Sequence, residues 1–227
     1  MENLNFFITN NVYATIINDK IYFFDLNKNR YYSAPLFCEN LPYKGNTLIV
    51  SQRLKNIEIA NSLVSQGLLT SYFSSANPHP FLSPSSTGDL LNIENEVDRS
   101  INLNFFIRFL ISIKLSSSWI PNLKITELKE KLSLIKNKFP QKKAELRSIS
   151  SLVRSHEKFR LYYWAPKSCL LDSVSLMLLL TYYGYSSQLI MGVKDEPFEA
   201  HCWLQVNETV LNDSLEKVQS FSPIFYI

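Results

Sequence analysis

The segment from Cys169 to Tyr183 constrains the fold of this 227-residue chain more than any other part of the sequence. Apolar side chains lie on nearly every face of the helix that it would form: Leu170, Leu171, Val174, Leu176, Met177, Leu178, Leu179 and Leu180. A helix that is hydrophobic all round is buried on all sides. Ser168 is a suitable N-cap for it and Gly184 a suitable stop. We therefore expect this helix at the centre of a domain core.

The segments around this helix predict an α+β domain. Three strands are expected after it, because apolar and polar residues alternate, or nearly so, between turn-forming residues. These strands are Ser187–Val193, His201–Val206 and Thr209–Leu211. Helical patterns precede it. The expected helices are Asp89–Lys114, Glu127–Phe139 with Thr126 as N-cap, and Gln141–Phe159.

The N-terminal residues predict a second, smaller module. β-branched and aromatic runs separated by Asn- and Asp-containing turns indicate a three-stranded antiparallel meander. Its strands are Val12–Ile17, Ile21–Leu26 and Arg30–Ala34. Helical spacing follows over 48–55 and 58–69, with Gly67 as a C-cap. A meander followed by short helices predicts a small winged-helix-like module.

A stretch rich in proline and small polar residues separates the two parts. Pro78, Pro80 and Pro84 lie among serines between residues 74 and 88, a composition that favours an extended, solvated chain. We therefore expect a winged-helix-like domain at 1–75, a linker at 76–88 and a second domain at 89–227.

Composition argues against several classes of function. The 5 glycines are too far apart for GxGxxG or GxxxxGK[ST], so we expect no phosphate-binding loop and no cofactor. A net charge of +3 without a basic stripe argues against nucleic-acid binding. The apolar runs fall short of the ~20 residues that a bilayer requires, so no membrane span is expected. Three scattered cysteines fit neither a disulfide framework nor a metal site, and no export signal is visible, which together predict a cytoplasmic protein.

Three residues of the C-terminal part suggest nucleophilic chemistry. Cys169 would occupy the first turn of the buried helix, where unpaired N–H groups and the helix dipole favour the thiolate. His201 opens a strand, and Asp213 follows the next strand. A nucleophile on a helix N-terminus, a base on a strand and an orienting carboxylate form a Cys-His-Asp arrangement.

This arrangement makes a demand on the loop between the last two strands. His201 and Trp203 share one strand face and Cys202 lies on the other. A two-residue loop at 207–208 would pair Cys202 with Asp213 and turn the carboxylate away from His201. We therefore expect an odd loop with a β-bulge, or an equivalent kink.

Each of these residues also has a purely structural interpretation. A lone cysteine in an apolar helix can be an inert core residue, and we interpret Cys202 as a buried filler. A histidine at the edge of a strand can simply be hydrogen-bonded. Asp172, one turn after Cys169, is accounted for by the helix dipole.

The segment from Cys169 to Asp213 resembles the transglutaminase-like leader peptidases of lasso-peptide biosynthesis. Those proteins share a C-L-x-D-S opening, a G-V strand end, P-F-x-A-H-x-W and V-L-N-D. All four elements are present, as Cys169–Ser173, Gly192–Val193, Pro197–Trp203 and Val210–Asp213. The departure within this block is Cys202, where the family usually has a small residue.

A shorter resemblance lies in the N-terminal module. Phe24–Tyr32 looks like the second hairpin of the PqqD-like precursor-recognition domain that this family carries. In such domains a leader peptide adds as a strand to the edge of the meander, beside the last helix. The resemblance implies that a leader binds along Arg30–Ala34 and contacts Tyr31, Tyr32 and Leu63. Simple packing of the two tyrosines is the alternative.

The resemblance also implies an activity, with a transglutaminase-like or papain-like C-terminal domain. The protein would bind a lasso precursor peptide and remove its leader, so that an ATP-dependent, asparagine-synthetase-like cyclase can close the macrolactam ring. Cys169 would attack the scissile carbonyl, His201 would transfer the proton and Asp213 would orient the imidazole. A transglutaminase-like acyl transferase and a non-catalytic precursor-binding scaffold stay open as alternatives.

Overall fold

The computed structural model of the chain describes residues 4–40, 47–72, 85–90, 102–143, 145–163 and 168–227. It divides into two compact units. The first comprises Met1–Ser83 with the short segments Val193–Glu199 and Ser222–Phe225, and the second comprises Pro84–Gly192, Ala200–Phe221 and Tyr226–Ile227. Helices and sheets occur together, as the expected α+β class requires. Most of the expected linker, 76–88, lies outside the described residues.

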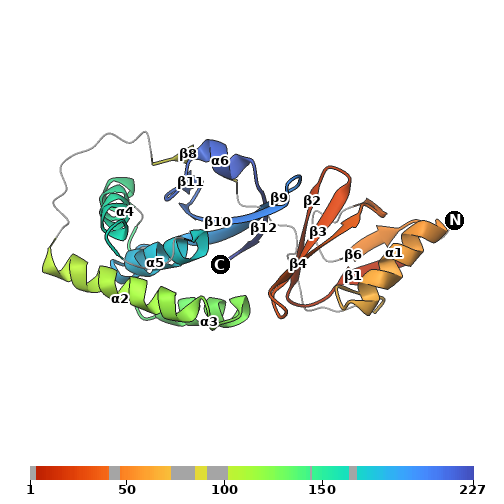
Figure 1. Cartoon of the computed structure of the whole chain (residues 1–227), viewed down its shortest axis with the longest axis horizontal. Coiled ribbons are helices and arrows are strands. Elements are labelled where there is room, and N and C mark those ends of the chain that lie inside the picture. Colours follow the sequence, from red (N-terminus) through yellow and green to blue (C-terminus); the bar gives the residue numbers. More distant parts are fainter. Residues whose placement is uncertain (1–3, 41–46, 73–84, 91–101, 144, 164–167) are drawn as a thin grey trace. The chain divides into compact units, whose positions relative to one another are not determined.

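Two sheets and one helix make up the described part of residues 4–72 (Figure 1). The predicted meander is confirmed as strands β2 (Val12–Ile17), β3 (Lys20–Asp25) and β4 (Arg30–Pro35), in the order β2-β3-β4. The second sheet has the order β5-β6-β1-β7, formed by β1 (Leu4–Ile8), β5 (Cys38–Asn40), β6 (Thr47–Val50) and β7 (Leu69–Thr70). Helix α1 spans Leu54–Ser65 and stops before Gly67, whose φ of 77° is the left-handed conformation that glycine adopts without strain.

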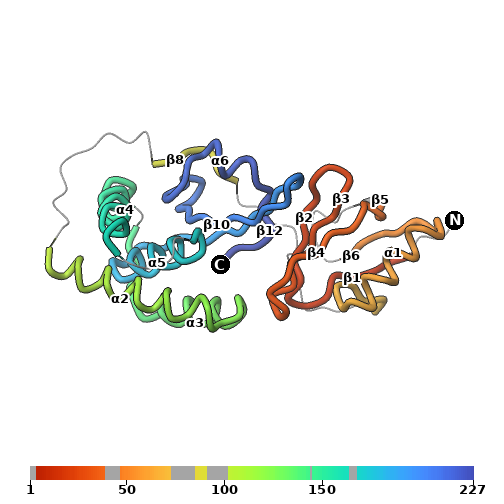
Figure 2. Tube along the Cα trace, in the orientation of Figure 1, coloured from red at the N-terminus to blue at the C-terminus, as the bar shows by residue number. Residues whose placement is uncertain are grey.

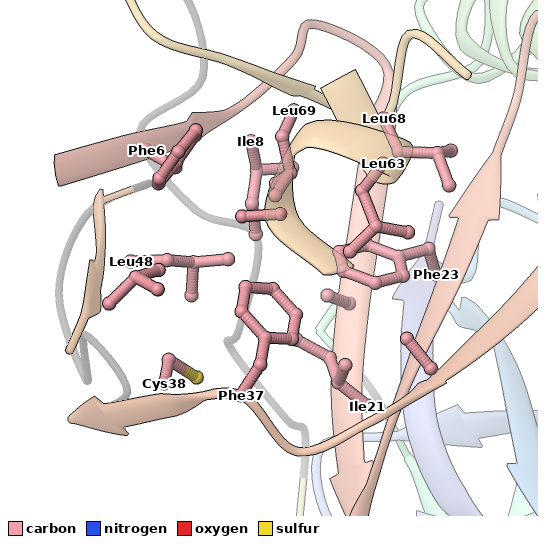
Figure 3. Packing of buried hydrophobic residues seen from close by; sticks show 14 of the residues in the cluster. Phe6, Ile8, Ile21, Phe23, Phe37, Cys38, Leu48, Leu63, Leu68 and Leu69 are labelled. Carbon is pink, nitrogen blue, oxygen red and sulfur yellow. The ribbon is translucent and has the colours of Figure 1, made fainter. Parts of the chain in front are cut away.

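Helix α1 and strands of both sheets share one hydrophobic core (Figure 3). Ile8 of β1 and Phe23 of β3 are completely buried there, and Leu63 of α1 is 4% exposed. Each sheet therefore covers the apolar face of the other, and α1 completes the cover.

The structure corrects one of the elements expected here. The helix predicted over 48–55 is wrong, because Thr47–Val50 is strand β6. Leu48 and Val50 are buried and alternate with half-buried neighbours, which is the period of a strand. Periodicity alone does not assign so short an apolar run. The winged-helix-like module is not confirmed, since the described part of residues 4–72 holds the single helix α1.

The described part of residues 85–227 forms five helices and a five-stranded sheet (Figure 1). The helices are α2 (Leu103–Trp119), α3 (Ile125–Lys136), α4 (Leu146–Arg160), α5 (Cys169–Tyr182) and α6 (Leu215–Gln219). The strands are β8 (Gly88–Asp89), β9 (Gln188–Lys194), β10 (Glu199–Val206), β11 (Thr209–Val210) and β12 (Ser222–Tyr226), in the order β12-β9-β10-β11-β8. The three strands expected after the central helix are thus confirmed, and β8, β12 and α6 are additional.

Helix α5 is the predicted central helix. Leu171 donates its backbone N–H to the side-chain oxygen of Ser168 at 3.1 Å, so Ser168 is the N-cap. Ten of the residues from Leu171 to Thr181 are buried, and α2, α3 and α4 all pack against the helix. Ser173 of α5 donates to the backbone carbonyl of Cys202 in β10 at 3.4 Å, so α5 also contacts the sheet. Both its start and its burial agree with the sequence.

Strand β8 comes from the end of the expected linker and forms one edge of the sheet. It pairs in parallel with β11, with Gly88 opposite Thr209. Figure 2 shows the yellow β8 segment beside the blue C-terminal part of the chain. Leu215, at the start of α6, donates its N–H to the carboxylate of Asp89 at 2.8 Å. Residues 88 and 89 are therefore part of the domain that holds α5.

Gly192 of β9 allows a close contact with the buried indole of Trp203. A Cβ at position 192 would lie 2.9 Å from the Trp203 ring and 3.0 Å from Cβ of Phe221, and the indole is 1% exposed and has no room to move. We expect Gly192→Ala to lower the free energy of unfolding by about 1–3 kcal/mol, measured as a lower urea midpoint at constant slope.

Gly88 provides a matched control for this prediction. A Cβ at Gly88 has no described atom within 4 Å beyond its chain neighbours. Gly88→Ala should stay within about 0.5 kcal/mol of wild type. Equal midpoints for the two variants would contradict the close packing at Gly192.

Candidate active site

Cys169 is the first residue of α5, at the exact place where the helix leaves its N–H groups unpaired. The thiol is free and half-buried. Ser168 caps the N–H of Leu171 from one side, which fixes the start of the helix beside the sulfur. The positive end of the helix dipole therefore favours a negative charge on Cys169.

His201 enters the site from β10. Its Nε2 lies 2.6 Å from Oδ2 of Asp213, and the imidazole N–H donates to that carboxylate oxygen. The ring also packs between Trp203, at a centroid distance of 6.2 Å, and Phe221, at 5.1 Å. Because Nε2 is engaged by Asp213, Nδ1 is the nitrogen left for Cys169.

Asp213 reaches His201 by a route that differs from the predicted one. The loop between β10 and β11 has two residues, Asn207 and Glu208, with Val206 opposite Thr209, so the expected odd loop is wrong. The kink lies instead at 211–213, where the chain bends after β11 ends. It turns the carboxylate toward the imidazole.

Asn212 makes this bend possible. Its Oδ1 accepts a hydrogen bond from the backbone N–H of Leu204 at 2.8 Å, in place of a backbone carbonyl. The chain can therefore turn away from β10 while the N–H of Leu204 keeps a hydrogen-bond partner. Its Nδ2 donates to Oγ of Ser173 at 2.9 Å. Since Ser173 also donates to the carbonyl of Cys202, these groups tie the first turns of α5 to β10.

The charges of the site stabilise one another. Hydrogen bonds from the Cys202 thiol and from His201 lower the pKa of Cys169 to about 4, against the opposite effect of burial. The hydrogen bond to Asp213, followed by that to Cys169, raises the pKa of His201 to about 9. Between these two values the sulfur is negative and the imidazole is positive.

Asp213 stays ionised throughout this range. Its burial acts to raise the pKa, but hydrogen bonds from His201 and Lys217 hold it at about 2. The side chain of Asp213 is only 15% exposed, and the N–H of Ser214 satisfies its second oxygen at 2.9 Å. The carboxylate is thus fixed on both sides.

Cys202 is part of the site, although the sequence suggested only a buried filler. It is 2% exposed, and both its thiol and its backbone N–H interact with the sulfur of Cys169. The Cys169 thiolate raises the pKa of Cys202 well above its ordinary value, so Cys202 remains a protonated donor. The missed signal is its position directly after His201, on the strand face opposite the imidazole.

Two further titratable groups near α5 have structural partners. The carboxylate of Asp172 accepts a hydrogen bond from Arg160, whose guanidinium also donates to the carbonyl of Tyr163 at 3.1 Å. His156 is buried and contacts Oγ of Ser175 at 2.8 Å, and burial lowers its pKa to about 3. Neither pair includes Cys169.

The expected substrate contacts belong to the first unit, whereas Cys169, His201 and Asp213 belong to the second. Tyr31 stacks on Phe24 at a centroid distance of 4.3 Å. Tyr32 packs against the first unit's core, and Leu63 lies inside that core rather than at its surface.

The described residues show no metal centre and no membrane helix. No three His, Cys, Asp or Glu side chains gather within them in a way that could hold a metal ion. None of the helices they form has both the length and the hydropathy needed to cross a bilayer.

The low pKa of Cys169 predicts alkylation at acidic pH. An ordinary thiol loses roughly 80-fold of its thiolate between pH 8 and pH 6, but a thiol with a pKa of about 4 loses almost none. We expect iodoacetamide to label Cys169 at nearly equal rates at both pH values, measured by mass spectrometry of the Cys169 peptide.

A small thiol in the same tube serves as the control for this experiment. His201→Ala should restore part of the ordinary pH dependence, because it removes the imidazolium. A wild-type rate that falls between pH 8 and pH 6 as steeply as that of the small thiol would contradict the ion pair.

Comparison with known proteins agrees with this geometry. The model of the Transglutaminase-like superfamily matches residues 111–226, more than half of the chain, and that range contains α5, β10 and Asp213. No curated protein and no solved structure matches the chain. The chain therefore belongs to the transglutaminase-like superfamily.

Proposed function

We propose that the protein is a cysteine peptidase that binds a ribosomally made lasso precursor peptide and removes its leader. The observation that carries this proposal is the placement of Cys169 at a helix N-terminus, beside an imidazole that Asp213 orients at 2.6 Å. The superfamily includes cysteine peptidases and acyl transferases, which use such a thiolate. The four motifs from Cys169 to Asp213 favour leader peptidases within it.

The chemistry follows from the charges of the site. The Cys169 thiolate attacks the scissile carbonyl, and the tetrahedral oxyanion is stabilised by N–H groups at the start of α5. The His201 imidazolium then gives its proton to the leaving amine, which departs with the core peptide. Water, deprotonated by the neutral imidazole, hydrolyses the thioester, which frees the leader carboxylate and restores the thiolate–imidazolium pair.

Binding of the leader is assigned to the first unit. In the order β2-β3-β4, strand β4 is an edge of its sheet, and an edge strand is the place where an extended peptide can add. Tyr31 and Tyr32 lie on this strand and are half-buried, so each ring has a part that a peptide can cover. Leu63 then supports α1 from within the core and does not itself touch the peptide.

The partner reaction is assigned to a separate chain. Leader removal exposes the α-amine that must attack an activated carboxylate to form the macrolactam. A free carboxylate does not react with an amine, the cyclase that the resemblance implies uses ATP to activate it, and this sequence holds no glycine-rich phosphate loop. We therefore assign ATP use to an asparagine-synthetase-like cyclase that acts on the product of this protein.

Cleavage of a precursor tests this function directly. The substrate is a short precursor peptide sought among the genes that neighbour the gene of this chain, and products are identified by mass spectrometry. Wild type should cut one bond, between leader and core. Cys169→Ala should lose activity by roughly 1,000-fold or more and still bind the leader, because the edge strand β4 is untouched.

Cys38→Ala is the matched control, since Cys38 is a buried thiol of the first unit and should not affect the chemistry. Incorporation of an added primary amine at the cut site, in place of water, would assign acyl transfer instead. Leader binding by a wild-type protein that cuts nothing would identify a non-catalytic scaffold.

A further inference from the structure

One oxygen of Asp213 accepts two hydrogen bonds. Oδ2 lies 2.6 Å from Nε2 of His201 and 2.8 Å from Nζ of Lys217. Lys217 belongs to α6, four residues after Asp213. Its side chain is 52% exposed, whereas the carboxylate that it contacts is 15% exposed.

We propose that Lys217 is a positioning residue that holds the Asp213 carboxylate in place and sets the alkaline limit up to which His201 stays protonated. This role rests on the Cys-His-Asp arrangement of the proposed function, but it requires no knowledge of the peptide substrate. Neither the sequence motifs nor the superfamily match singles out Lys217.

The direction of the effect follows from the geometry. An ammonium on Oδ2 competes with the imidazolium for the same lone pairs, and the two cations repel each other. Both effects make the protonated ring less favourable, so Lys217 opposes the stabilisation that Asp213 and Cys169 give to the imidazolium. Without Lys217, His201 should hold its proton to a higher pH.

The other charged groups around the site stay constant when Lys217 is changed. His201 faces Cys169 from α5 and Asp213 from the bend, and the rings of Trp203 and Phe221 carry no charge. On the carboxylate, the remaining donor is the N–H of Ser214.

Two more carboxylates lie on neighbouring elements. Asp89 of β8 accepts the first N–H of α6, and Asp172 of α5 is paired with Arg160. Cys202 stays protonated beside Cys169. A change at Lys217 therefore isolates one contact.

Titration of the His201 ring by NMR tests this inference in the full-length protein. The wild-type midpoint should lie at about pH 9. Lys217→Met should raise it by about half a pH unit, the size of effect that an exposed ammonium has on a carboxylate pair. The signal is assigned by its loss in His201→Ala, and His156 does not interfere because its pKa is about 3.

Two further variants separate the contact from net charge. Lys217→Arg keeps a cation in reach of Oδ2 and should return the midpoint toward wild type. Glu216→Gln changes the net charge by one on the neighbouring exposed position of α6 and should leave the midpoint nearly unchanged. A Lys217→Met midpoint equal to wild type would overturn the proposal. So would equal and opposite shifts in Lys217→Met and Glu216→Gln, since these indicate a long-range charge effect.

The outcomes also distinguish this inference from the proposed function. A protein that cuts no precursor but shows the Lys217-dependent shift retains the positioning role and loses the substrate assignment. A wild-type His201 midpoint near the ordinary value of 6.5 removes both, because the ion pair itself is then absent.

Discussion

The burial of α5 on all sides is the constraint on which the rest of the C-terminal domain depends. Val174, Leu176, Leu179 and Leu180 are completely buried, and each buried side chain of this size contributes about 1.5–3 kcal/mol relative to an exposed one. Such a helix has one stable position between α2, α3, α4 and the sheet. Its N-terminus is consequently fixed as well, and with it the sulfur of Cys169. The position of the Cys169 sulfur is fixed because the apolar side chains that follow it in α5 are tightly packed.

The polar groups of the site link that helix to the sheet and stabilise charge. Asn212 and Ser173 join α5 to β10 by hydrogen bonds, while the raised pKa of His201 and the lowered pKa of Asp213 make their charged forms part of the fold. The stabilisation from His201 is complete below pH 6.5 and is lost as the pH rises through about 9. That from Asp213 is complete above pH 3.8 and is lost as the pH falls through about 2. The charged site therefore supports the fold across the neutral range.

The sequence predicts those parts of the structure that depend on local chemistry. Hydrophobic periodicity and turn residues predict the α5 segment, its Ser168 cap and the meander. The sequence motifs predict the site residues Cys169, His201 and Asp213. What it does not predict depends on partners distant in sequence. The sequence predicts a helix where strand β6 lies, because four residues are too few to show a clear periodicity. The bend that places Asp213 near His201 depends on the side chain of Asn212, whose oxygen accepts a hydrogen bond in place of a backbone carbonyl. Cys202 enters the site through its contact with Cys169, from which it is distant in sequence, whereas Lys217 reaches Asp213 from only four residues further along the chain.

The arrangement at Cys169 determines how an acyl group is taken up but not what receives it. A thiolate, an imidazolium and a fixed carboxylate form the same thioester whether water or an amine attacks next, so hydrolysis and acyl transfer share every residue described in the site. The choice of peptide must therefore arise outside the reacting atoms. In the first unit, β4 ends the strand order β2-β3-β4, and an extended chain can in general add to such an edge through backbone hydrogen bonds.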